Sequence, residues 1–418
     1  MADSPPHELL AVSFAFPPLA YPRSGQVARL VKHISFKTVL VCADEEGARR
    51  DATLEPDAEQ HLAACLRIPF SLRGWRGRAE GVATRLKLPL WGKRPDHYSS
   101  WKRPALKALK DFTRDSRFAP DVMVTFGQPM TDHIIGLKLK KIYRVPWAAH
   151  FSDPWVDNPF MRYDALALKV NRSLERKVVR TADQLIFTSQ ETVELMMAKY
   201  PPEWRAKARV LPHSFEPSHY PPAREPEGEA VVVRYTGEFY GKRTPKPLVQ
   251  ALRSILDTNP RLLANVRFEL IGQTSAEARA ASGMDSLPEG LVVTKPAVNY
   301  RESLALAAAA DGLLIIDAPA QRSVFLPSKL IDYIGAGRPI LGLTPAGAAA
   351  DLINQLGGRV ADPTDAAAMR RETEAFLSSL SADRKRPRLP WGAPEIRKRY
   401  EAPAVAQMFE GMLRELLA

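Results

Sequence analysis

Cysteine is scarce in this 418-residue sequence, which has only Cys42 and Cys65. Two cysteines are too few for a disulfide framework, and they fit a reducing compartment. No window reaches about 18 apolar residues, the shortest run expected of a membrane-spanning helix. The N-terminus contains acidic residues and prolines where a signal peptide needs a basic start and a longer apolar run. We therefore expect a cytoplasmic protein, either soluble or attached peripherally to the inner face of a membrane.

Sequence motifs for common cofactors and metals are missing as well. There is no GxGxxG fingerprint, which disfavours a nicotinamide-dependent dehydrogenase. There is no HExxH helix, no cluster of cysteine and histidine, and no DxD-type acidic triad. Because structural and catalytic metal sites need such ligand sets, we predict no metal ion and no cofactor.

Charge is distributed unevenly along the chain, which carries a net charge of +12. Residues 66–110 contain twelve Lys or Arg against two acids, with Phe70, Trp75, Trp91 and Trp101 among them. Basic residues mixed with aromatic ones are typical of a surface that contacts anionic membranes or nucleic acid. A solvated face with a few core anchors is the simpler interpretation. No recognisable nucleic-acid module accompanies the charge, so we predict an anionic membrane surface as the partner of residues 66–110, and no nucleic acid.

The first half of the sequence alternates apolar runs with helical patterns. The run at residues 12–16 reads as a buried strand, a helical pattern follows at 26–34, and residues 38–42 form a second strand. This β-α-β order favours a parallel sheet with helices on both faces, the doubly wound α/β plan. Further strands are expected at 121–126, 146–149, 184–188 and 209–211, and helices at 132–141 and 165–179.

The alternation of apolar runs and helical patterns begins again after a segment rich in proline and glutamate. We divide the chain into an N-terminal α/β domain (1–215), a linker (216–228), a second α/β domain (229–398) and a C-terminal crossover helix (399–418).

The second domain repeats the alternation of strands and helices. Strands are expected at 230–237, 266–272, 291–294, 312–317, 339–344 and near 360, and helices at 247–257, 301–310 and 328–337. In the last segment, Val405, Met408, Met412 and Leu416 are spaced as the apolar stripe of a helix. We expect this helix to cross back to the N-terminal domain.

The segment PSKLIDYIGAGRPIL, residues 327–341, resembles the donor-binding element of glycosyltransferase family four. That element has a proline, an acidic residue near the helix start and a small-x-Gly-x-Pro ending, which Pro327, Asp332 and Pro339 match here. Three more segments resemble other parts of proteins in this family, namely the turn at 237–252, the loop at 145–155 and the crossover at 211–217. The resemblance covers nearly the whole chain. It implies the GT-B fold, in which two doubly wound Rossmann-like domains face a central cleft. It also implies that the domain at 1–215 is on the acceptor side and that the domain at 229–398 binds the nucleotide-sugar donor.

The chemistry of a nucleotide-sugar donor gives roles to residues near these motifs. A diphosphate needs cations or the N–H groups of a helix start, and Arg243 and Lys329 lie at two predicted helix starts. A ribose diol is held by one carboxylate that accepts from both hydroxyls, and Asp332 is the candidate. An acidic residue in a first helical turn is also a common stabiliser of the helix dipole. Gly25 follows the first predicted strand, where glycine permits close approach of the backbone to phosphate; an ordinary turn glycine is the alternative.

His150 and Asp153 lie at the end of a predicted strand, where a doubly wound sheet binds its ligands. We interpret them as catalytic residues that hold a donor hydroxyl or the acceptor nucleophile. The alternatives are a structural histidine and an aspartate that caps a helix or a turn. Glu175, on the following predicted helix, is interpreted as a surface acid.

Two positions depart from the family pattern. Many members have a second acid eight residues before the ribose acid, where Val324 stands here. Many also have Arg after the glycine of the phosphate turn, where Glu238 stands. The donor sugar is therefore assigned to backbone N–H groups of Ser323, Val324, Phe325 and Leu326.

The resemblance implies a retaining, metal-independent transferase that moves a sugar from a nucleotide-sugar donor by front-face displacement. The leaving diphosphate is stabilised electrostatically and accepts the acceptor's proton. The basic segment indicates a lipid-linked or glycan acceptor in cell-envelope polysaccharide biosynthesis. Two alternatives remain open. One is a nucleotide-sugar 2-epimerase of the same fold, and the other is a catalytically degenerate scaffold protein, which the two departures favour.

Overall fold

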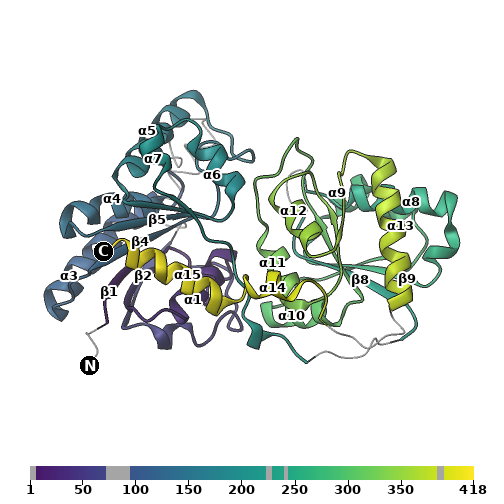
Figure 1. The fold of residues 1–418 in the computed structure, drawn as a ribbon, viewed down its shortest axis with the longest axis horizontal. Helices are drawn as coiled ribbons and strands as arrows, with labels where there is room; N and C mark the ends of the chain where they lie inside the picture. Colours follow the sequence, from purple (N-terminus) through teal and green to yellow (C-terminus); the bar gives the residue numbers. More distant parts are fainter. Residues whose placement is uncertain (1–5, 72–94, 223–227, 240–242, 384–389) are drawn as a thin grey trace. The chain divides into compact units, whose positions relative to one another are not determined.

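The structure is a computed structural model that describes residues 6–71, 95–222, 228–239, 243–383 and 390–418. The chain forms two compact units (Figure 1). The first comprises Met1–Pro212 together with Ala402–Ala418, and the second comprises His213–Glu401. The predicted first domain ended at residue 215, whereas the first unit ends at Pro212. The predicted linker 216–228 falls within the second unit.

The first unit is built on a seven-stranded sheet in which every neighbouring pair is parallel. The strand order is β3-β2-β1-β4-β5-β6-β7. The strands are β1 (Glu8–Val12), β2 (Lys37–Glu45), β3 (Ala64–Phe70), β4 (Val122–Gly127), β5 (Trp147–Phe151), β6 (Gln184–Phe187) and β7 (Ala208–Val210). The central strands are apolar along their whole length because helices cover both faces of the sheet, which leaves no residue facing water.

Helices form a layer on each face of this sheet (Figure 1). α1 (Pro22–Lys32) and α15 (Ala402–Glu415) pack against each other and share one apolar core with the strands. The other core contains α3 (Lys102–Ser116), α4 (Thr131–Tyr143), α5 (Ala165–Thr181), α6 (Gln190–Met197) and residues beside α7 (Pro202–Arg205). Local sequence fixes two of the helix starts. Asp164 accepts from the N–H of Ala167 at 2.8 Å, and Ser189 accepts from that of Thr192 at 3.1 Å.

The second unit has a six-stranded parallel sheet of order β10-β9-β8-β11-β12-β13. Its strands are β8 (Val231–Thr236), β9 (Val266–Ile271), β10 (Val292–Lys295), β11 (Gly312–Ile316), β12 (Ile340–Leu343) and β13 (Arg359–Ala361). One core contains residues of α8 (Lys246–Thr258) and α13 (Ala366–Asp383). The other contains residues of α10 (Tyr300–Ala309), α11 (Ser328–Ala336) and α12 (Ala348–Gln355), with α14 (Pro394–Lys398) beside them. α9 (Ala276–Ser282) follows β9.

The C-terminal helix belongs to the first unit, as the sequence predicted, but it buries a different stripe. Val405, Phe409 and Leu413 are fully buried, whereas Met408 is 44% exposed. Residues four apart stay on one face of a helix, while adjacent residues lie about 100° apart around its axis. Met408 was therefore wrongly placed in the predicted stripe, whereas Val405 is buried and Met412 and Leu416 pack against the same core. The larger Phe409 sets the buried face.

The first strand and its loop also differ from the prediction. The strand covers Glu8–Val12, and the apolar run at 12–16 continues past its end because the following loop is itself buried. The N–H of Phe14 donates to Asp132 at 2.7 Å, so a side chain replaces the sheet as its partner.

Candidate functional site

The carboxyl edge of the second sheet gathers the charged residues predicted to bind a donor. Parallel strands end at one common edge, where ligands bind in this class of sheet. Arg243 precedes α8 and is 9% exposed. Its Nη2 donates at 2.9 Å to Asp317, which directly follows β11. The other Asp317 oxygen accepts from the hydroxyl of Ser323 at 2.8 Å. Asp317 thus fixes the guanidinium and the loop after β11 together.

Lys329 lies in the first turn of α11, as predicted, and its ammonium is held by an aromatic side chain. Its Nζ donates to the hydroxyl of Tyr235 at 2.7 Å and lies 3.9 Å from the ring centroid. Burial and, second, the nearby charge of Arg243 lower the pKa of Lys329 to about 7, against the opposing carboxylates of Asp317, Glu238 and Asp332. The structure therefore brings the three predicted donor residues, Arg243, Lys329 and Asp332, into one electrostatic cluster.

The position of Lys329 explains why residue 237, directly after β8, is a glycine. Its φ is +133°, and a Cβ at this position would lie 2.5 Å from Nζ of Lys329. Both the backbone conformation and the space exclude a larger residue. A side chain from α11 thus makes the glycine of the predicted phosphate turn necessary.

Asp332 lies one turn deeper in α11 than predicted, since the first helical turn contains no acid. Its Oδ1 accepts from the hydroxyl of Tyr300 at 2.9 Å, and its backbone carbonyl accepts from that of Tyr220 at 2.8 Å. A Cβ on Gly335 would lie 2.3 Å from the Tyr220 ring, so this motif glycine makes room for a tyrosine. Because Asp332 is outside the first turn, the helix dipole does not explain it.

The loop predicted to face the donor sugar is fixed at its first residue. The N–H of Ser323 donates to the carbonyl of Ala346 at 2.8 Å, and its hydroxyl binds Asp317. Both groups of Ser323 therefore stabilise the loop, so its N–H is not available for a sugar hydroxyl as predicted. Val324 and Phe325 are half-buried, and Leu326 is buried in a core. The sugar contacts assigned to these three residues stay predictions.

The first unit has its own cluster at the carboxyl edge of its sheet, centred on His150. This residue lies in β5 and is 2% exposed. Arg23, in the first turn of α1, is 6% exposed, and its Nη2 lies 2.8 Å from Nδ1 and 3.1 Å from the carbonyl oxygen of His150. Burial lowers the pKa of Arg23 to about 9, and the carboxylates of Asp153 and Asp132 oppose that shift. Burial also raises the pKa of Asp153 to about 6. Arg23 was not predicted from the sequence. The available signal was a cation in the first turn of a helix, which is unusual.

Gly25 lies within α1 and not in a loop, which corrects the prediction. A Cβ there would lie 2.9 Å from the guanidinium of Arg29 and 3.1 Å from Leu54. Arg29 forms a buried ion pair with Glu55 at 2.9 Å. The glycine therefore provides space for this ion pair, and its contact with a donor phosphate stays a prediction.

Glu175 is fully buried, so its interpretation as a surface acid is wrong. One carboxylate oxygen accepts from the N–H of Val156 at 2.9 Å, and the other accepts from the hydroxyl of Tyr200 at 2.6 Å and pairs with Lys199 at 2.7 Å. Glu175 thereby anchors the loop that follows β5. Its position in the helical pattern gave no signal of this, because the partners come from elements far away in the sequence.

The basic segment 66–110 lies partly outside the described residues, since 72–94 with Trp75 and Trp91 are not included. Within the described part, Phe70 is 7% exposed and Trp101 is fully buried, and both belong to the core. These two aromatic side chains are core anchors, which was the simpler interpretation.

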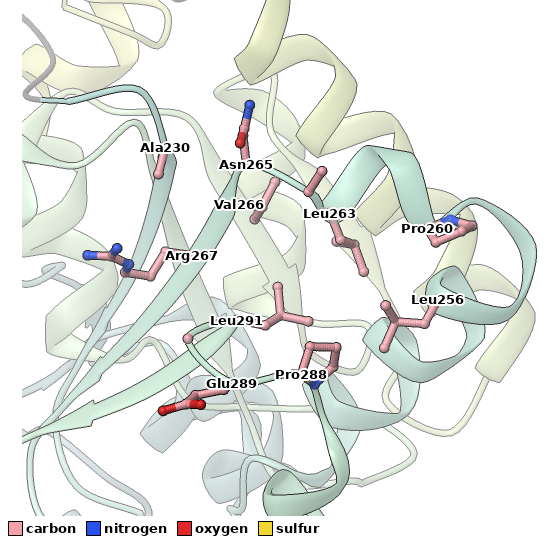
Figure 2. Close-up of a pocket in the computed structure, with 12 residues that line it drawn as sticks. Ala230, Leu256, Pro260, Leu263, Asn265, Val266, Arg267, Pro288, Glu289 and Leu291 are labelled. Carbon is pink, nitrogen blue, oxygen red and sulfur yellow. The ribbon is translucent and has the colours of Figure 1, made fainter.

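A cavity of about 500 Å³ opens at the opposite, amino-terminal edge of the second sheet (Figure 2). Leu263, Val266 and Leu291 contribute apolar side chains to it, and Glu289 and Arg267 also line it. It contains none of the predicted site residues.

Comparison with known proteins gives a family match for part of the chain and establishes the fold. Residues 27–213 match the family described as "Glycosyl transferase 4-like domain". No curated protein sequence matches the chain. Among solved structures, the sucrose-phosphate synthase of Thermosynechococcus elongatus is similar, with a TM-score of 0.66 and 14% identity over 98% of this chain and 99% of that chain. The N-terminal domain of the Candida albicans trehalose-6-phosphate phosphatase is similar with a TM-score of 0.65 and 12% identity, over 98% of this chain and 97% of that chain.

A lipopolysaccharide outer core galactosyltransferase gives a TM-score of 0.58 at 12% identity, over 98% of this chain and 99% of that chain. These identities establish the fold alone. The predicted GT-B fold is confirmed, as is the resemblance to glycosyltransferase family four. Among the described residues, no helix combines the length and apolar character that crossing a bilayer requires.

Proposed function

We propose, from the premise that the chain is a GT-B glycosyltransferase with a glycosyl transferase 4-like domain at residues 27–213, that it transfers a sugar from a nucleotide-sugar donor with retention of configuration. The observation that carries this proposal is the cluster of Arg243, Lys329 and Asp332 at the carboxyl edge of the second sheet. One nucleoside diphosphate offers the matching groups, namely two phosphates and a ribose diol.

The charge balance of the cluster supports a diphosphate as its ligand. Asp317 offsets one cation by its ion pair with Arg243. The hydrogen bond of Lys329 goes to a neutral hydroxyl, so its buried ammonium lacks a carboxylate partner among the described residues. Burying a cation in this way is costly unless an anion accompanies it. A phosphate in reach of both cations would remove that cost and would be bound by charge-assisted hydrogen bonds.

We assign the remaining contacts in the same way. The carboxylate of Asp332, positioned by Tyr300, accepts from the ribose hydroxyls, and residues 324–326 contact the donor sugar. His150 and Asp153 of the first unit hold a donor hydroxyl or the acceptor nucleophile. The reaction is metal-independent, since Arg243 and Lys329 stabilise the charge that develops on the leaving diphosphate. That diphosphate takes the acceptor's proton.

The acceptor in this proposal is a lipid-linked or cell-envelope glycan, reached at the cytoplasmic face of a membrane. The outer face of α5 supports a contact with anionic lipid. It carries five exposed cations and no exposed acid, and Phe160, Met161 and Leu166 beside its start are 44–49% exposed. The five cations are Lys169, Arg172, Arg176, Lys177 and Arg180. Like charges spaced four apart destabilise a helix, and an anionic surface with an apolar interior would offset this.

Vesicle binding tests the membrane contact. Neutralising Lys169, Arg172 and Arg180 to Gln is expected to lower partitioning onto anionic vesicles roughly hundredfold, at about 1 kcal/mol per cation. Neutralising Arg261, Arg267 and Lys398, three exposed cations of the second unit, is the control with the same change in net charge. Equal loss in both triple variants, or no binding to anionic vesicles by the parent protein, contradicts this part of the proposal.

Thermal shift with a panel of nucleoside diphosphates tests the donor site, because a ligand bound only to the native state raises the melting temperature. We expect stabilisation by one diphosphate, lost in Arg243→Gln. Incubation with the corresponding nucleotide sugar alone then separates transferase from 2-epimerase, since an epimerase converts its substrate without an acceptor. A folded protein that no diphosphate stabilises supports the scaffold alternative.

A further inference from the structure

We infer that Arg23 is a positioning residue that holds His150 in the tautomer with its proton on Nε2, so that His150 meets a substrate oxygen as a hydrogen-bond donor and not as a base. The contact between the two residues stands on geometry alone. The reading of His150 as a residue that touches substrate rests on the proposed function.

The tautomer follows from the chemistry of the two side chains. The guanidinium of Arg23 has five N–H donors and no acceptor. Its Nη2 lies 2.8 Å from Nδ1 of His150, which is hydrogen-bonding distance. Nδ1 must therefore accept with its lone pair, and a neutral imidazole then carries its single hydrogen on Nε2. A hydrogen on Nδ1 would place two donors against each other.

Arg23 also fixes the orientation of the imidazole. The same Nη2 is 3.1 Å from the carbonyl oxygen of His150, so one nitrogen contacts the side chain and the backbone of this residue. Nη1 donates to Gln26 at 3.2 Å, and the guanidinium lies 5.3 Å from the ring centroid of Phe126. The Phe126 ring is in turn 5.5 Å from that of His150. These contacts hold both partners within one buried cluster.

The nearby titratable groups leave this pairing intact. Asp132 accepts from the backbone of Phe14, and His133, whose pKa burial lowers to about 3, binds Thr125 at 2.7 Å. Asp153 acts on Arg23 through its charge. Nδ1 of His150 itself faces the guanidinium of Arg23. A carboxylate there would hold a hydrogen on Nδ1 and leave Nε2 as a general base, which is the opposite arrangement.

Burial of Arg23 argues that the contact has a role beyond packing. Its Nε has no hydrogen-bond partner among the described residues, and its best acceptor is a neutral imidazole in place of a carboxylate. Such a site is a poor one for a cation on grounds of stability. It is, however, the arrangement that prevents His150 from taking up a second hydrogen. The proton of the attacking acceptor must then go elsewhere, in agreement with its transfer to the leaving diphosphate.

Nitrogen-15 NMR of the full-length protein labelled at histidine tests the inference without any need for activity. Couplings between ring nitrogens and carbon-bound hydrogens identify the tautomer, and the His150 signals are assigned by their loss in His150→Asn. We expect the neutral Nε2–H form in the parent protein at every pH from about 5.5 to 8, a window that spans the usual histidine pKa. An Nδ1–H form, or a doubly protonated ring at neutral pH, overturns the inference.

Variants of Arg23 make the test specific. In Arg23→Met we expect the neutral ring to show Nδ1–H signals, and doubly protonated signals to appear below about pH 7, near the usual histidine pKa. Arg23→Lys keeps a donor and is expected to keep the parent signals. Lys32→Met, which removes a cation of the same helix that pairs with Asp57, is the control. If Arg23→Met folds and retains the parent spectrum, Arg23 does not set the tautomer. If Arg23→Met does not fold, the parent spectrum and Arg23→Lys decide.

Transfer activity supplies a second readout once a donor is known. The pH profile of Arg23→Met should gain an ionisation that the parent and Arg23→Lys lack. If no nucleotide sugar is turned over, the proposed function fails, while the NMR result on the tautomer stands by itself.

Discussion

Binding of a nucleoside diphosphate should depend on pH through Lys329. The pKa of this lysine is lowered to about 7 by burial and by Arg243. A bound diphosphate favours the ammonium and raises that pKa toward its ordinary value, near 10.4. The protein must therefore take up a proton on binding whenever the pH is above 7. Affinity is expected to be greatest near and below pH 7 and to fall as the pH rises.

The size of the effect follows from the same pKa. At pH 8 about a tenth of the free protein carries the ammonium, and at pH 9 about a hundredth, so the dissociation constant should rise by up to tenfold per pH unit. Each tenfold step corresponds to about 1.4 kcal/mol. The diphosphate itself contributes little to this slope above pH 7.5, since the second pKa of a phosphate is about 6.

Calorimetric titration in two buffers of different ionisation enthalpy measures both quantities. We expect an uptake of about 0.9 proton per diphosphate bound at pH 8, from a free-state pKa of about 7. Lys329→Met should bind more weakly at pH 7 and lose the pH dependence. Lys295→Met, which removes a 41% exposed lysine paired with Glu269, should retain it. Constant affinity from pH 7.5 to 9, without proton uptake in a protein that binds diphosphate, would refute the reasoning.

Three further substitutions have clear expectations. Gly237→Ala should lower the unfolding free energy by about 1–3 kcal/mol in urea denaturation, because its φ of +133° and the contact with Lys329 leave no room for a methyl group. Glu175→Gln should cost about 3 kcal/mol in the same assay, since it leaves the buried partners of a carboxylate uncompensated; a loss below 0.5 kcal/mol would contradict this role. Asp332→Asn should weaken nucleoside diphosphate about tenfold, the loss of one charged hydrogen bond, but leave inorganic pyrophosphate unchanged in calorimetry. Equal losses for both ligands would argue against a ribose contact.

The sheets were predictable because their strands are buried on both faces. A run such as VMVTF in β4 is apolar throughout, and its length and spacing from the next helix identify it without any structure. β3 and α3 escaped prediction for the opposite reason. β3 is an edge strand that contains Arg67 and Pro69. α3 lies in the most basic part of the sequence, where the many charged residues make the apolar positions that face the core hard to recognise.

Only those residues of the donor cluster that have a local signal in the sequence could be predicted. Arg243, Lys329 and Asp332 stand beside helix starts or within a recognisable motif. Asp317 and Tyr235, which hold the two cations, come from other strands, and no sequence spacing relates them to the motif. An acid directly after an apolar strand was the signal available for Asp317, because that position lies at the ligand-binding edge of a parallel sheet.

The motif glycines show that contacts within the protein can also require a glycine near a predicted phosphate site. A glycine near a phosphate site is commonly explained by close approach of the backbone to the ligand. Here Gly237 makes room for Lys329, and Gly25 makes room for Arg29. In the first case the consequence is functional, because the ammonium occupies the space beside the turn itself. A substitution at Gly237 would therefore displace the cation before it touched any ligand. Weakened diphosphate binding in Gly237→Ala should then be accompanied by loss of the pH dependence that Lys329 confers, whereas a clash with the phosphate alone would leave that dependence in place.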